Sequence, residues 1–205
     1  MLVLASAVVV AAVAVAGCSA EAPEEVVTRS SVSDPAGDVV VGGLGEDRES
    51  IDAAPRNTIT DIVATTIDHG TDTITIDVAF EDLRPRQYLD LTADVTTDGT
   101  GSGRATQVTA LTYLGESSID VYHGNETSTC VDAEVVVDDG LDTVTVSVPR
   151  ACLDDPRWIE AEVRAATMRY RATGPRADAV WEDDAYATGL VEWSDRGTSV
   201  RLHHP

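Results

Sequence analysis

The sequence predicts an all-β protein: a single antiparallel β-sandwich, jelly-roll-like, with little helix. Two features lead to this prediction. Apolar and polar residues alternate over many short segments, which places the apolar side chains on one face of each strand. Turn-forming residues separate these segments at a spacing of about 8–12 residues, which is typical of antiparallel sandwiches rather than of parallel sheets.

The expected strands are rich in Val, Ile and Thr, whose branched side chains suit a half-buried pleated surface. In one of them the even positions from 74 to 80 are apolar and the odd positions from 73 to 77 are polar. Strands are expected at residues 60–68, 72–80, 88–97, 105–114, 117–123, 131–137, 142–148 and 158–170. Residues 42–58 carry turn-formers and charges without a sustained period, so we expect a long surface loop there. Residues 177–186 are expected to form a helical turn or two.

The N-terminal residues predict an exported, lipid-anchored protein. Residues 2–17 are all apolar or small, which suits a signal-peptide core and is somewhat short for a spanning helix. The run ends in Val-Ala-Gly-Cys18, which resembles the bacterial lipobox, whose cysteine is lipidated and becomes the mature N-terminus. An N-terminal membrane anchor that is never cleaved is the alternative. The expected parts are a lipoprotein signal peptide (1–17), an acidic tether (18–30) and the sandwich domain (31–205).

The other two cysteines, Cys130 and Cys152, are expected to form a disulfide, the simplest state for two cysteines in an exported domain. The expected turn DDGL, at 138–141, joins two strands. Pairing Val137 with Asp142 places Cys130 opposite Pro149, three residues before Cys152. A loop that doubles back there would bring the two sulfur atoms within bonding distance.

The formal net charge of −22 limits the partners of this protein. All 14 basic residues are arginine, against 36 acidic residues. Such a surface repels nucleic acid and anionic lipid head groups, so no nucleic-acid partner is expected. It attracts divalent cations or basic partners.

No catalytic motif stands out, so the chain is not expected to be an enzyme. Ser102 lies in GTGSG, without the strand–turn–helix setting of a nucleophile elbow. The four histidines are scattered, with no spacing typical of a zinc site, and each is expected at the solvated surface; His69 falls in an expected hairpin turn. Carboxylates are too numerous for a catalytic pair to be chosen. A hydrolase of unknown substrate is therefore the least favoured function.

Exposed aromatic rings would indicate a carbohydrate-binding surface, because flat rings stack on the apolar faces of pyranose sugars. Core packing is the expected role of each ring, since Trp and Tyr are usually buried in large part. A row of exposed rings on one sheet face would instead favour sugar binding. The candidates are Tyr122, Trp158, Trp181, Tyr186 and Trp193.

The stretch DPAGD, from Asp34 to Asp38, has two interpretations. Its proline and glycine suit an ordinary turn, in which an aspartate caps its own backbone. Alternatively, Asp34 and Asp38 bind calcium, which takes about six to eight oxygen ligands. Asp61 has the register of inward-facing residues, where an aspartate needs a partner or a cation. Asp184, in an acidic cluster, is the fourth candidate ligand, and backbone carbonyls of the turn and of the 42–58 loop would complete the shell.

DPAGD, a loop and TDIVATTIDHGTDTITIDVAF together resemble the opening of DOMON-like sandwiches related to the family-nine carbohydrate-binding modules. Those domains begin with the same turn, loop and Asp-Ile strand, and some bind a structural calcium there. The resemblance therefore implies calcium ligation by Asp34, Asp38 and Asp61. TVSVPRACLDDPRWIEAEV resembles the later part of similar actinobacterial exported proteins. The two matches touch most of residues 31–170, and such sandwiches bind sugars, haem or no known ligand.

The sequence thus predicts a non-catalytic binding or interaction module at the cell surface. It would be anchored through a lipid on Cys18 to the outer face of the cytoplasmic membrane. One disulfide and one structural calcium would stiffen the domain. Its partners would be the membrane, through the lipid, and a glycan or a cell-surface protein; a carbohydrate-binding module is the alternative function.

Overall fold

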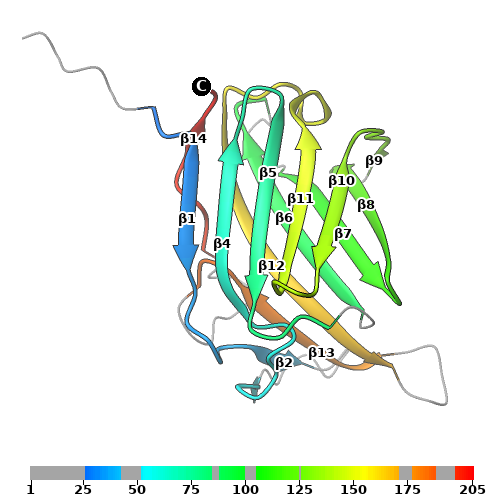
Figure 1. Cartoon of the computed structure of the whole chain (residues 1–205). Coiled ribbons are helices and arrows are strands. Elements are labelled where there is room, and N and C mark those ends of the chain that lie inside the picture. Colours follow the sequence, from blue (N-terminus) through cyan, green and yellow to red (C-terminus); the bar gives the residue numbers. More distant parts are fainter. Residues whose placement is uncertain are drawn as a thin grey trace, which may run out of the picture.

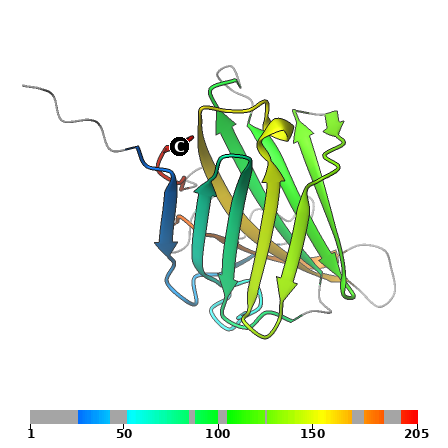
Figure 2. The ribbon, with the colours of Figure 1, turned by 45° about the horizontal axis from the view of Figure 1, so that its top comes forward.

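The computed structural model describes residues 26–42, 52–84, 88–99, 105–124, 126–170, 177–187 and 197–205. In these residues two antiparallel sheets pack face to face, and the strands of one sheet cross those of the other at an angle (Figures 1 and 2). The described chain contains no α-helix, and its one helical element is a short 3-10 turn, η1 (Arg150–Leu153). The predicted all-β sandwich is confirmed. No helix in the described ranges is long and apolar enough to cross a membrane.

The first sheet has five strands. In spatial order they are β1 (Arg29–Ser33), β4 (Ile62–His69), β5 (Thr73–Phe80), β11 (Thr143–Pro149) and β10 (Glu134–Asp138). The second sheet is larger. Its order is β3 (Asp52–Ala53), β2 (Val40–Gly42), β13 (Ala177–Asp184), β12 (Trp158–Tyr170), β6 (Leu89–Thr97), β7 (Thr106–Tyr113), β8 (Glu116–His123) and β9 (Glu126–Ser128), while β14 (Leu202–His203) also pairs with β12.

The core lies between the two sheets and contains the apolar positions that the alternating pattern predicts. On β5 the side chains of Ile74, Ile76 and Val78 are at most 2% exposed, and the intervening polar residues are half-buried. On β12 the alternate residues from Ile159 to Ala165 are buried in the same way from the second sheet. Removing a Val or Ile side chain from water contributes about 1.5–3 kcal/mol, which makes this layer the main source of stability.

The expected hairpin forms, but its register differs by two residues from the prediction. Val137 pairs with Val144 rather than with Asp142. Asp142 adopts a left-handed φ of 54° and belongs to the turn, where its carbonyl accepts the Phe80 N–H at 2.8 Å and its Oδ1 accepts the Leu83 N–H at 2.9 Å. These bonds to β5 and the residues after it hold Asp142 out of the ladder. A shift of two residues keeps every side chain on its predicted face.

The prediction of a helical turn in residues 177–186 is wrong, because this segment contains strand β13. The segment pairs with β12 on one side and with β2 on the other, so its backbone bonds are made between strands. Hydrogen bonding to two neighbours outweighs the local helix preference of its alanines and acidic residues. The expected loop at 42–58 also contains strand, since β2 ends at Gly42 and β3 occupies Asp52–Ala53.

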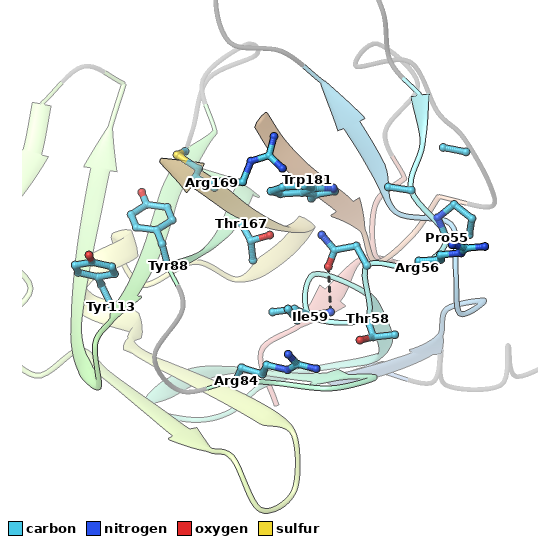
Figure 3. Close-up of a pocket in the computed structure, with 14 residues that line it drawn as sticks. Pro55, Arg56, Thr58, Ile59, Arg84, Tyr88, Tyr113, Thr167, Arg169 and Trp181 are labelled. Atoms are coloured by element: carbon cyan, nitrogen blue, oxygen red, sulfur yellow. Dashed lines mark hydrogen bonds between the residues drawn. The ribbon is translucent and has the colours of Figure 1, made fainter. Parts of the chain in front are cut away.

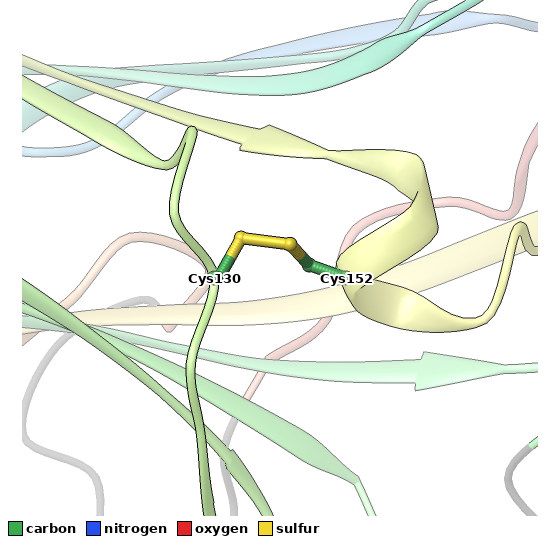
Figure 4. The surroundings of a disulfide bond; sticks show 2 residues. All are labelled: Cys130 and Cys152. Atoms are coloured by element: carbon green, nitrogen blue, oxygen red, sulfur yellow. A yellow bond between two sulfur atoms is a disulfide. The ribbon is translucent and has the colours of Figure 1, made fainter.

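The predicted disulfide between Cys130 and Cys152 is confirmed. Their Cα atoms lie 5.8 Å apart, and the two residues are separated by 22 positions in the sequence. Cys152 lies on η1, directly after β11, and Cys130 lies on the segment that leads into β10 (Figure 4). The bond therefore closes the open end of the β10–β11 hairpin.

The two ends of the described chain are joined beside β4. Strand β1 begins at Arg29, so two residues of the expected tether belong to the sheet. The carbonyl of Val27 accepts the His203 N–H at 2.7 Å, which links the start of the domain to β14. The expectation of a surface position is wrong for His69, which is 0% exposed at the end of β4. Its Nδ1 lies 3.2 Å from the carbonyl oxygen of Leu202, a geometry in which the ring donates to the carbonyl.

Candidate metal centre and the pocket beside it

Three aspartates that are far apart in the sequence meet where β2 and β13 run past the end of the first sheet (Figure 1). Asp34 and Asp38 flank the turn between β1 and β2, and Asp183 lies on β13. One carboxylate oxygen from each of the three lies within 4.8 Å of the others. The turn needs Gly37, whose φ of 89° is a conformation that other residues adopt only with strain.

Backbone N–H groups hold two neighbouring carboxylates in place. Asp61 precedes β4, and its Oδ2 accepts the Gly37 N–H at 2.7 Å. Asp183 accepts the Ile62 N–H at 2.7 Å through Oδ2 and the Asp184 N–H at 3.0 Å through Oδ1. The turn, the start of β4 and β13 are therefore joined through carboxylates rather than through backbone pairing alone.

The cluster contains buried carboxylate oxygens that have no hydrogen-bond partner. Among them are Oδ2 of Asp34, a residue that is 8% exposed, and Oδ1 of Asp61, a residue that is 0% exposed. A buried polar atom without a partner costs about 1–3 kcal/mol, and a charged one costs more. Such atoms need either a proton or a cation.

Burial and mutual repulsion raise the pKa values of these carboxyl groups. Burial, followed by the charges of Asp183 and Asp38, raises the pKa of Asp34 from 3.8 to about 8. Burial also raises the pKa of Asp183 to about 7 and that of Asp61 to about 6, although the backbone N–H bonds that both accept act in the opposite direction. Without a cation, the cluster would retain protons near neutral pH. A divalent cation would replace those protons and compensate the repulsion.

The size and chemistry of the cluster fit calcium. Oxygen ligands lie about 2.3–2.6 Å from Ca²⁺, so two ligands on opposite sides of the ion are separated by about 4.6–5.2 Å. The oxygens of Asp34, Asp38 and Asp183 lie within 4.8 Å of one another, which is close enough for one ion of this size to contact all three. Calcium also prefers oxygen ligands, and the donors in this group are carboxylate oxygens.

The structure brings the four predicted calcium ligands into one region, but only two of them belong to the 4.8 Å group. Asp34 and Asp38 belong to the 4.8 Å group. Asp61 adjoins the group through Gly37. Asp184 acts on Asp34 through its charge, and its Oδ1 accepts the Tyr186 N–H at 2.9 Å. Part of the loop expected to add carbonyls, residues 43–51, lies outside the described residues.

Sequence reasoning missed Asp183, the third member of the 4.8 Å group. Asp184, the residue next to it, was chosen only because it lies in an acidic cluster. In a strand, successive side chains point to opposite faces. Asp183 therefore shares the inner face of the sheet with Trp181, while Asp184 occupies an alternate position. The signal that could have identified Asp183 is the alternation of the segment, had it been assigned to a strand.

A pocket with a volume of about 900 Å³ is lined by residues 53–59 and by Trp181, which is two residues from Asp183 on β13 (Figure 3). Thr167 and Trp181 pair across β12 and β13, so both face the inside of the second sheet beyond the end of the first. The volume lies in the range of about 300–1,000 Å³ that is usual for small-molecule sites. The principal aromatic and charged residues of the lining are Arg56, Arg84, Tyr88, Tyr113, Arg169 and Trp181.

One of the five aromatic candidates, Trp181, lines this pocket. The guanidinium of Arg201 lies over the ring of Trp158, with 3.9 Å between its Cζ and the ring centroid. Tyr122 and Tyr186 are half-buried, and Trp193 lies outside the described residues. Sequence reasoning missed the other two rings of the pocket, Tyr88 and Tyr113, because only the β6–β7 register places them side by side.

No protein-family model, curated protein or solved structure matches this chain. The class of this protein is therefore taken from its structure alone. It belongs to the class of disulfide-bonded, all-β sandwich proteins. A buried aspartate cluster and an aromatic pocket adjoin each other at one end of the sandwich.

Proposed function

We propose that this chain is a non-catalytic binding or interaction module of the cell surface that contains one structural calcium. A lipid on Cys18 anchors it to the outer face of the cytoplasmic membrane. Cys18 and the expected signal peptide lie outside the described residues, so the anchor rests on the lipobox-like sequence. The calcium is held by Asp34, Asp38 and Asp183, with Asp61 and Asp184 beside them.

The observation that carries the calcium proposal is the buried, unpartnered Oδ2 of Asp34 inside a group of three carboxylates. Asp34 is 8% exposed and Asp183 is 7% exposed, so neither is open to a substrate of any size. The cluster connects the turn before β2, the start of β4 and β13. An ion there would stabilise the fold rather than catalyse a reaction.

Thermal melting of the full chain in detergent tests the calcium proposal. Calcium at about 100 times its dissociation constant would stabilise the folded state by about 2.7 kcal/mol. For a chain of this size that corresponds to a rise in Tm of about 5–10 °C over the value in EDTA. Magnesium should not reproduce the rise, because it requires a smaller, near-octahedral shell.

Two variants complete this test. Asp183→Asn should abolish the calcium-dependent rise in Tm, because it removes one carboxylate of the 4.8 Å group. Asp132→Asn is the matched control, since Asp132 is an exposed aspartate before β10. Identical melting curves of the parent chain in EDTA and in calcium would show that the cluster binds no calcium.

A carbohydrate-binding module is the second candidate function, and the aromatic pocket favours it. Tyr88, Tyr113 and Trp181 place three rings around one opening (Figure 3). Rings of this kind stack on pyranose faces, although here they line a pocket and do not form the exposed row on one sheet face that would favour sugar binding. A glycan array probed with the full chain tests this candidate. Binding that survives Trp181→Ala would place any sugar site elsewhere.

A further inference from the structure

The charges around the pocket are opposite in sign to those of the protein as a whole. The chain has 36 acidic and 14 basic residues. Among the described residues that line the pocket, three are arginine and none is aspartate or glutamate. An even distribution of charge would place more than two acidic residues beside every basic one. Arginine is therefore the charged residue type of the described pocket lining on an acidic molecule, and one of the three, Arg84, is ion-paired with Asp82.

Hydrogen-bond donors also predominate in the pocket. The Oδ1 of Asn57 already accepts the N–H groups of Ile59 and Thr60, at 3.1 and 3.2 Å, so its amide NH₂ is the group left to offer. The hydroxyl of Thr167 is paired with that of Thr60 at 2.6 Å. Arginine adds donors and no acceptors. A ligand that satisfies this lining must present acceptors, and an anion does so best.

Two of the three guanidinium groups are held in place before any ligand arrives. Arg169 lies over the ring of Trp181, with 5.5 Å between its Cζ and the ring centroid. Arg84 donates from Nε and Nη2 to Oδ2 of Asp82, at 3.1 and 2.6 Å. A guanidinium carries five N–H donors in a fixed planar arrangement, so these contacts orient each group. Figure 3 shows Arg84 opposite Arg169 and Trp181 across the opening.

The tyrosines supply a flat apolar surface next to the arginines. The rings of Tyr88 and Tyr113 are 6.3 Å apart, with 59° between their planes. Tyr113 is 53% exposed, so much of its ring is accessible. Figure 3 places these rings at one side of the pocket and Arg56 at the other. Rings beside arginines suit a ligand with both a stackable face and a carboxylate.

We propose that this pocket binds an anionic saccharide, namely a sugar that carries a carboxylate, such as a uronic acid. The pyranose ring stacks on an aromatic side chain, and the carboxylate accepts hydrogen bonds from arginine, with Arg169 as the principal donor. This inference rests on the second candidate function and specifies its ligand. It does not depend on the calcium proposal.

Isothermal titration of the full chain in detergent, at an ionic strength of about 0.15 M, tests the inference. The probes are a uronic-acid trisaccharide and its methyl ester, which keeps the rings and removes the charge. The acid should bind at least about tenfold more tightly than the ester, since charge-assisted hydrogen bonds are the stronger kind. Arg169→Gln should remove this preference and leave the affinity for the ester unchanged.

The chain offers a matched control in Arg201→Gln. Arg201 also lies over a tryptophan, Trp158, and donates to a carboxylate, Glu160, but it lies outside the pocket lining. Its loss should leave the affinity for the acid unchanged. Arg56→Gln provides a second pocket variant in the exposed loop, for the case in which Arg169→Gln unfolds. It should lower the affinity for the acid and not for the ester.

Three results would overturn the inference. Equal affinities for acid and ester would show that charge is not recognised, although the chain would still bind sugar. An equal loss in Arg201→Gln and Arg169→Gln would place the site elsewhere. No binding of either probe would reject the inference and, with a silent glycan array, the carbohydrate-binding candidate too. The calcium-dependent melting would be unaffected in all three cases, so the failures can be told apart.

Discussion

The Oδ2 of Asp61 accepts the backbone N–H of Gly37 at 2.7 Å. The residue that precedes β4 therefore caps the turn of the DPAGD stretch, 24 positions earlier in the chain. Oδ1 of Asp61 and Oδ2 of Asp34 are both buried without a hydrogen-bond partner. The DPAGD turn therefore reverses the chain and also contributes carboxylates to the aspartate cluster.

The first prediction is that the metal-free protein loses stability as the pH rises from 6.5 to 8. The pKa of Asp34 is raised to about 8 and that of Asp183 to about 7, against 3.8 ordinarily. In this window the folded state binds protons that the unfolded state has released, so the free energy of unfolding falls with pH. We expect a loss on the order of 2 kcal/mol, or about 4–8 °C in Tm, in melts with EDTA.

The range from pH 6.5 to 8 was chosen because the protonation of His69, which changes the free energy of unfolding in the opposite direction, occurs below it. Burial lowers the pKa of His69 below its ordinary value of 6.5. The unfolded state therefore takes up this proton first, and stability falls only as the pH drops below 6.5. Saturating calcium should flatten the Tm profile above that pH. A Tm that rises from pH 6.5 to 8 in EDTA would contradict the raised pKa values of the cluster.

The second prediction is that Asp34→Asn stabilises the metal-free protein at pH 8. Asparagine nearly preserves the shape and removes a charge that faces other carboxylates. Relief of that repulsion should contribute on the order of 1 kcal/mol, which raises Tm by about 2–4 °C. The same variant should lose most of its response to calcium. A lower Tm for Asp34→Asn than for the parent chain in EDTA would contradict this prediction, because it would show that the Asp34 carboxylate stabilises the metal-free fold.

The third prediction concerns the bond between Cys130 and Cys152. Replacing both residues with serine opens a loop with a sequence separation of 22. The chain-entropy model gives a loss of about 3 kcal/mol for such a loop, or about 6–12 °C in Tm. Dithiothreitol should lower the Tm of the parent chain and leave the double variant unchanged. Thiol titration of the denatured, unreduced parent should detect no free sulfhydryl at these two positions.

The fourth prediction is that Cys18 carries a diacylglyceryl group and is the mature N-terminus. Intact-mass analysis of the membrane fraction should find a chain without residues 1–17 and with the added lipid mass. Cys18→Ala should be released from the membrane or remain unprocessed. An unmodified Cys18 still joined to residues 1–17 would favour the alternative of an uncleaved N-terminal anchor.

Features that depend on neighbouring residues could be predicted from the sequence. The strand positions, such as β5 and β12, follow from alternation, because a pleated chain turns successive side chains to opposite faces. The disulfide follows from the number of cysteines in a domain that the sequence predicts to be exported. Asp34 and Asp38 were recognisable because five consecutive residues define their turn.

Only the tertiary structure decided which distant residues meet. Asp183 joins Asp34, and Tyr88 lies beside Tyr113, through strand pairings that no local pattern encodes. The register of the β10–β11 hairpin depended on Asp142, whose bonds to Phe80 and Leu83 come from another strand and the loop after it. Strand β13 formed where local preference favoured helix, because two neighbouring strands supply its hydrogen bonds. Local sterics act over a few residues, whereas strand pairing and side-chain packing depend on the whole chain. The residues that make up the aspartate cluster and the aromatic pocket could therefore be identified only in the folded structure.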